Sequence, residues 1–183
     1  MPCCLDESGN VDPFSGSRFL VVTILVTLVP RSIELHVKRA RKSLGKKPAP
    51  SEMKASTSEP KIVERLLKAI AQENVEIVAV IVDKQSILRA PRDSEDIYRL
   101  AVTKAITHCV ERWPRGTFYL DKRYTKRALR YQLEETIREG LVEVLQEVVL
   151  IRQEDSLVRK ELQAGDHTAF DENYSMISHG CQG

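Results

Sequence analysis

Apolar residues near the start of the chain form two short runs that predict strands. Residues 3–7 and 18–29 hold these runs, and the polar segment between them predicts an antiparallel hairpin with a longish loop. A helix is predicted next, with Pro30 at its start and Gly45 as its stop, because apolar residues recur at helical spacing between them.

The rest of the chain alternates between amphipathic and apolar segments. Helices are predicted over 60–73, 95–113 and 125–139 and around 162–166, and strands over 75–82, 117–121 and 147–152. The strand over 75–82 is almost continuously apolar, which predicts burial on both faces. The order of elements predicts an α/β domain in three layers, a mixed sheet of five to six strands flanked by helices. We expect a single domain over 1–171 and a polar, disordered tail over 172–183.

Composition narrows the class of protein. The 183 residues are 42% hydrophobic and 30% charged, a globular balance, and the net charge of +2 is too small to prove a polyanionic partner. The four cysteines lack the spacing of a zinc site, which favours buried reduced thiols and a cytoplasmic protein. The first residues do not have the order of a signal peptide. The longest apolar run reaches only about half of a membrane span, so we expect no membrane association.

Acidic residues stand at the carboxyl ends of three predicted strands. Asp6, Asp83 and Asp121 hold these positions, where the ligand crevice of an open α/β sheet lies. Carboxylates brought together there repel one another unless a cation compensates, and oxygen ligands suit Mg²⁺ or Mn²⁺. Asp166 could add a carboxylate from the last helix. Aspartate after a strand is also a common cap or loop residue, so only the coincidence of several positions favours a metal site.

Asp6 and Glu7 are neighbours in one predicted strand. Successive side chains of a strand point to opposite faces, so only one of the two is expected in a given site. The position of Asp166 favours Asp6.

These acidic segments resemble the uncharacterised "domain of unknown function 3800" family. The resemblance rests on Leu5–Gly9, Ser51–Ser56, Val82–Lys84, Leu120–Arg123, Glu154–Ser156 and the closing Leu162–Asp166, in that order. It implies a ribonuclease H-like fold and a nuclease-like site in which Asp6 and Asp166 are the first and last acidic residues. The chain departs from the family at Gly165, which weakens a helix by about 1 kcal/mol relative to alanine. It also ends soon after Asp166, where members of the family continue with a longer apolar helix. We therefore expect a C-terminally shortened member of the family.

The strand order expected of a ribonuclease H-like fold helps to choose between Asp83 and Asp121 as the nearer partner of Asp6. In ribonuclease H-like domains the first strand lies beside the strand that follows the first crossover helix, here the one over 75–82. That order favours Asp83, whereas the motif resemblance keeps Asp121, and both stay candidates.

Two functions are compatible with these observations. The first is a nuclease that acts on nucleic-acid phosphodiesters with Mg²⁺ or Mn²⁺. Asp6 and Asp166 would hold the metal together with either Asp83 or Asp121. The alternative is a catalytically degenerate module that binds nucleic acid or a partner protein through the basic helix over 33–44. Shared ions require carboxyl oxygens within roughly 5–6 Å of one another.

A row of arginines follows Asp121. Arg123, Arg127 and Arg130 are spaced to share one helix face, where they could bind substrate phosphates. An ordinary solvated face with Glu134 and Glu135 as partners is the competing interpretation.

Overall fold

The protein folds around a mixed sheet with the strand order β3-β2-β1-β4-β5. The computed structural model describes residues 1–12, 16–44, 53–88, 91, 93–141, 150–155 and 159–179. The strands are β1 (Pro2–Ser8), β2 (Phe19–Thr27), β3 (Val75–Asp83), β4 (Thr117–Asp121) and β5 (Leu150–Glu154). β2 is antiparallel to both β1 and β3, while β4 is parallel to β1 and β5 is parallel to β4. β1, β3, β4 and β5 therefore end at the same edge of the sheet.

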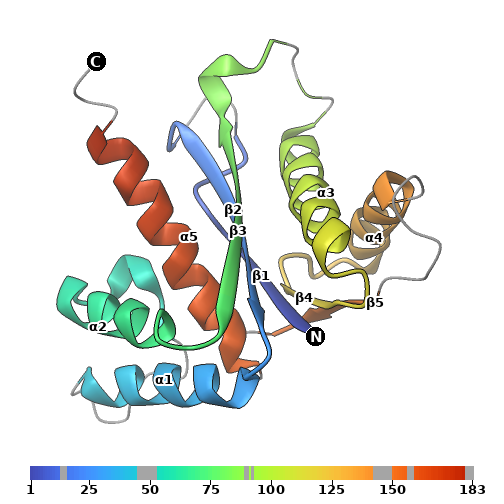
Figure 1. The fold of residues 1–183 in the computed structure, drawn as a ribbon. Coiled ribbons are helices and arrows are strands. Elements are labelled where there is room, and N and C mark those ends of the chain that lie inside the picture. The colour runs from blue at the N-terminus through green and yellow to red at the C-terminus, as the bar shows by residue number, and fades with distance from the viewer. Residues whose placement is uncertain are drawn as a thin grey trace.

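Helices cover both faces of this sheet (Figure 1). They are α1 (Pro30–Ser43), α2 (Pro60–Ile70), α3 (Ser94–Arg112), α4 (Arg127–Leu141) and α5 (Lys160–His179), with 3₁₀ turns at Ala55–Thr57 (η1) and Lys84–Ser86 (η2). α1, α2 and α5 lie on one side, and α3 and α4 on the other. No helix in the described ranges is both long and apolar enough to cross a bilayer.

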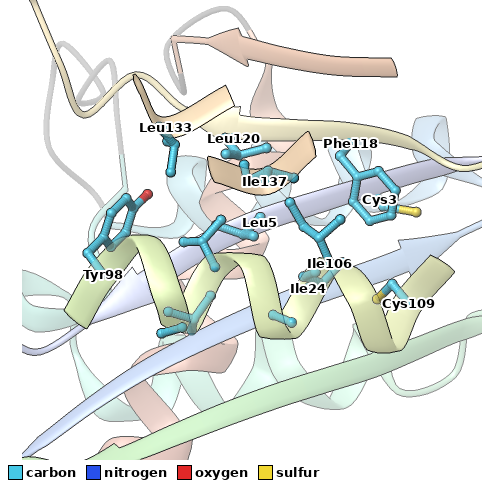
Figure 2. Packing of buried hydrophobic residues seen from close by; sticks show 14 of the residues in the cluster. Cys3, Leu5, Ile24, Tyr98, Ile106, Cys109, Phe118, Leu120, Leu133 and Ile137 are labelled. Atoms are coloured by element: carbon cyan, nitrogen blue, oxygen red, sulfur yellow. The ribbon is translucent and has the colours of Figure 1, made fainter. Parts of the chain in front are cut away.

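The two faces of the sheet have separate apolar cores because strand side chains alternate. Leu5 and Leu120 of the sheet pack with Ile106 of α3 and with Leu133 and Ile137 of α4 (Figure 2). The opposite face is filled by residues of β2, α1, α2 and α5 together with Met53. This agrees with the predicted α/β class, in which helices flank a mixed sheet.

Three cysteines are part of this packing. Cys3, Cys4 and Cys109 are buried and free, and burial raises the pKa of Cys3 to about 11 and that of Cys109 to about 12. These thiols stay protonated and unreactive at neutral pH. The prediction of buried reduced thiols is confirmed for them, while Cys181 lies outside the described residues.

The structure corrects three sequence-based expectations. Among the strands that the structure describes, β3 lies at the edge and pairs with β2 alone, and Ile77 is 47% exposed, so the prediction that this strand is buried on both faces is wrong. The neighbours of β1 are β2 and β4, so the strand over 75–82 does not lie beside the first strand. The last helix, expected around 162–166, is longer than predicted, because α5 continues to His179, well past Asp166.

Candidate active site

Asp6 lies near the end of β1 and its side chain is directed at α5. The residue is only 9% exposed, and its Oδ1 accepts a hydrogen bond from the backbone N–H of Glu7 at 2.8 Å. Burial raises the pKa of Asp6 well above its ordinary value, and the charges of Glu7, Asp166 and Asp121 raise it further. A buried carboxyl group whose pKa is raised by three other acidic residues is the central feature of this edge of the sheet.

Glu7 points to the opposite face of β1, as strand geometry predicts. There its Oε1 accepts a hydrogen bond from Nη1 of Arg123 at 2.8 Å. Burial nevertheless raises the pKa of Glu7, with Asp121 and Asp166 adding to the shift. The two neighbours thus face opposite sides of β1, as predicted, although the charges of Asp121 and Asp166 still act on Glu7 at the strand end.

Asp121 ends β4, the parallel neighbour of β1, with Leu5 of β1 opposite Leu120. This sheet order brings Asp121 into the electrostatic environment of Asp6 and Glu7. The Oδ1 atom of Asp121 accepts a hydrogen bond from the backbone N–H of Lys122 at 2.9 Å. Of the two strand-end candidates, Asp121 is the one that joins the cluster.

Asp83 lies apart from the other carboxylates, at the end of an edge strand separated from β1 by β2. It pairs with Arg18 through Nη2–Oδ2 and Nε–Oδ1 contacts of 2.7 and 3.1 Å, and it caps η2 by accepting from the backbone N–H of Gln85. Arg18 is the main cause of a pKa lowered to about 2. Asp83 is thus a cap and an ion-pair partner, the structural role that aspartate often has after a strand.

Asp166 comes from α5 and fixes a distant segment. Its Oδ2 accepts a hydrogen bond from the backbone N–H of Ala55 at 2.8 Å, and Oε1 of Gln163 accepts from that of Met53 at 3.3 Å. Two motifs far apart in the sequence therefore meet here. Gln163 is fully buried and lies about one helical turn before Asp166. Both side chains therefore face the same segment, which contains Met53 and Ala55.

Arg123 has a different role from the one its spacing predicts. Its guanidinium binds both Glu7 and Glu95 and lies 4.5 Å from the ring centroid of Tyr98. The hydroxyl of Tyr124 completes the network by donating to Oε2 of Glu95 at 2.5 Å. Arg123 is therefore a counter-ion of the acidic cluster, and its hydrogen bonds are made within the protein.

Arg127 and Arg130 lie away from this network, on α4. They line a hollow of about 180 Å³ together with Tyr131, Glu134 and Gln153, and we call it the α4–β5 pocket. The predicted arginine row thus separates into one internal ion-pair residue and two pocket residues. The sequence does not identify Gln153 as a candidate, because no motif includes it. Only the packing of β5 beside α4 places it in this pocket.

The donor set has the chemistry of a magnesium or manganese site. Asp6, Glu7, Asp121 and Asp166 supply oxygen atoms, and their mutual repulsion is what a divalent cation relieves. In the conformation shown, however, no three Asp, Glu, His or Cys side chains within the described ranges are grouped so that they could hold an ion. The residues fit such an ion by type and charge, and binding it requires the side chains to converge.

Comparison with known proteins supports the fold. The chain is similar to a structure of the PCNA:RNase HII complex from Archaeoglobus fulgidus, with a TM-score of 0.64 and 15% sequence identity. The match covers 98% of this chain and 74% of the other. The fold is ribonuclease H-like. No family model and no curated protein matches the sequence, so the resemblance to the "domain of unknown function 3800" family stays a prediction.

Proposed function

We propose that this protein is a nuclease that hydrolyses nucleic-acid phosphodiesters with the help of Mg²⁺ or Mn²⁺. The observation that carries the proposal is the burial of Asp6 among Glu7, Asp121 and Asp166 at the carboxyl edge of the sheet. Grouped, desolvated carboxylates destabilise a protein, so their presence together favours a binding role over a structural one. The fold shared with RNase HII, by name a ribonuclease, is consistent with this activity.

Each residue of the cluster has a distinct part in the proposal. Asp6, Asp121 and Asp166 would be cation ligands, with Glu7 beside them. The backbone N–H groups of Glu7 and Ala55 orient Asp6 and Asp166, and Arg123 restrains Glu7 while offsetting one negative charge. When bound, a divalent cation in such a site activates water and stabilises the charge that develops on the phosphodiester.

A cleavage assay tests the proposal. Purified protein is incubated with labelled single- and double-stranded DNA and RNA, with Mn²⁺, with Mg²⁺ and with EDTA. We expect cleavage with either metal and none with EDTA, and we expect Asp6→Asn to lower the rate at least a hundredfold.

Asp83→Asn is the matched control, because Asp83 also follows a strand but lies outside the cluster. It should cleave like the wild type. Cleavage that survives Asp6→Asn would refute the site. Binding of nucleic acid without cleavage would favour the alternative of a degenerate binding module.

A further inference from the structure

The α4–β5 pocket contains a buried acceptor whose orientation is fixed. Nε2 of Gln153 donates to the backbone carbonyl of Arg130 at 3.2 Å and to Oε1 of Glu134 at 3.0 Å. Both partners are acceptors only, so the amide cannot be turned round without losing two hydrogen bonds. Oε1 of Gln153 is consequently left buried, with no partner among the described residues.

The same pocket contains a buried donor. Nε of Arg130 has no hydrogen-bond partner within the described part of the chain, and water does not reach it. Most buried polar atoms of folded proteins are hydrogen-bonded, so two exceptions on residues that line one hollow call for an explanation. A ligand that carries an acceptor next to a donor would satisfy both.

An aromatic side chain borders the pocket. Tyr131 is 53% exposed, and Arg127 lies 5.1 Å from its ring centroid and donates to its hydroxyl from Nε at 3.0 Å. Exposed tyrosine rings and arginine planes are the groups on which unpaired bases stack. Because solvent reaches neither Nε of Arg130 nor Oε1 of Gln153, a ligand in the hollow would contact these atoms only after neighbouring side chains move aside.

We propose that the α4–β5 pocket receives one unpaired nucleobase of a nucleic-acid strand, with guanine preferred. The O6 atom of guanine would accept from Nε of Arg130, and its N1–H and N2 amino groups would donate to Gln153 and Glu134. A phosphate offers acceptors only, so it would leave Oε1 of Gln153 unsatisfied and be repelled by Glu134. The volume of about 180 Å³ lies below the range of drug-sized sites and suits a group as small as one base.

The location of the pocket connects it to the acidic cluster. Gln153 is the register partner of Leu120, so the pocket begins on the strand next to Asp121, one residue before the strand end. A base held there would set which nucleotide approaches the carboxylates. The inference rests on the proposed function for the identity of its ligand as nucleic acid, but it does not require cleavage.

Binding in EDTA, where no cleavage is expected, tests the inference by itself. Fluorescence anisotropy is measured for the full chain with labelled single strands whose residues are all abasic except for one central guanine, hypoxanthine or uracil, and with a fully abasic strand. We expect the guanine strand to bind about tenfold or more tightly than the abasic strand. Hypoxanthine lacks the N2 amino group and should fall between them.

Arg130→Lys keeps the charge but removes the Nε donor, and it should abolish the preference for guanine while leaving the affinity for the abasic strand unchanged. Arg138→Lys is the control on the same helix, outside the pocket, and should behave like the wild type. Tyr131→Leu, at an exposed position, should weaken binding of every strand that has a base at the central position.

Equal weakening of all strands by Arg130→Lys would identify a phosphate contact and overturn the inference, as would no effect of Arg130→Lys. Competition by guanosine monophosphate at the concentration of the strand would show that a free nucleotide is the ligand. Cleavage without base preference overturns the base pocket alone, and guanine preference without cleavage in Mn²⁺ overturns the proposed nuclease alone.

Discussion

Gly165 of α5 lies so close to Asp6 of β1 that a Cβ atom built on the glycine would stand 3.0 Å from the Cβ of Asp6. The backbone N of Asp6 and the carbonyl of Cys4 are the next nearest atoms, at 3.6 and 3.8 Å. Glycine weakens a helix by about 1 kcal/mol relative to alanine, yet here it allows the helix to cross the strand at the centre of the acidic cluster. The apparent flaw in the closing motif is therefore a packing requirement.

Gly165→Ala tests this requirement. The added methyl group gains helix propensity but pushes α5 from β1 by a few tenths of an ångström, and Asp166 moves with the helix. We expect a fall in the cleavage rate of tenfold or more and a change in thermal stability below about 1 kcal/mol, because propensity offsets the strain. Wild-type cleavage by this variant would show that the close contact is not needed.

Asp6→Asn is expected to stabilise the protein in the absence of divalent cations. The substitution removes one of four mutually repelling carboxylates and keeps an acceptor for the N–H of Glu7. A gain of about 1 kcal/mol would raise the Tm by about 2–4 °C at neutral pH. Asp83→Asn, which breaks the pair with Arg18, should lower the Tm instead. Millimolar Mg²⁺ should raise the Tm of the wild type more than that of Asp6→Asn.

The difference in stability between the wild type and Asp6→Asn should change with pH in a definite direction. The folded-state pKa of Asp6 lies above the ordinary value of 3.8, so the native state binds more protons than the unfolded state in the interval between them. Stability contributed by this residue therefore falls as the pH rises from about 4 through the raised pKa. Thermal unfolding of the two proteins in EDTA should show the advantage of Asp6→Asn growing with pH. An advantage that shrinks over this range would contradict the raised pKa.

Arg123→Gln is predicted to destabilise the fold. Its guanidinium joins Glu7 to Glu95 and lies over the Tyr98 ring, so its loss leaves two partly buried carboxylates without their cation. We expect a loss of about 2–4 kcal/mol in the free energy of unfolding, measured by denaturant titration. Arg112→Gln breaks a largely exposed pair with Glu76 and should cost less than about 1 kcal/mol. Equally small losses of unfolding free energy in both variants would show that the ion pairs of Arg123 stabilise the fold no more than an exposed pair does.

His167 makes the protein sensitive to acid. It is fully buried, neither ring nitrogen has a partner among the described residues, and burial lowers its pKa from 6.5 to about 4. The unfolded state binds the extra proton first, so stability is lost as the pH falls from about 6.5 to about 4. His167→Leu should flatten the Tm profile over this interval. His108→Leu, at an exposed histidine on α3, is the matched surface variant.

Much of the secondary structure follows from local pattern. The hairpin, the helix after Pro30 and the short strand ending at Asp121 agree with the structure, because their apolar spacing and their proline and glycine boundaries are properties of short segments. Gly9 in the opening motif is a further example. It has a φ of 94°, and a Cβ there would stand 2.3 Å from the carbonyl oxygen of Phe19, so the turn requires glycine.

Sequence alone also determined that carboxylates end the strands and that Asp6 and Glu7 face opposite sides of β1. Only the tertiary structure decided which of these carboxylates lie near one another. Asp121 rather than Asp83 joins Asp6 because β4, not β3, pairs with β1, and strand order depends on pairing between segments distant in the chain. Likewise Arg123 differs from Arg127 and Arg130 through its distant partners Glu7 and Glu95. Local residue spacing fixes the direction of a side chain, whereas its partner is fixed by the packing of the whole fold.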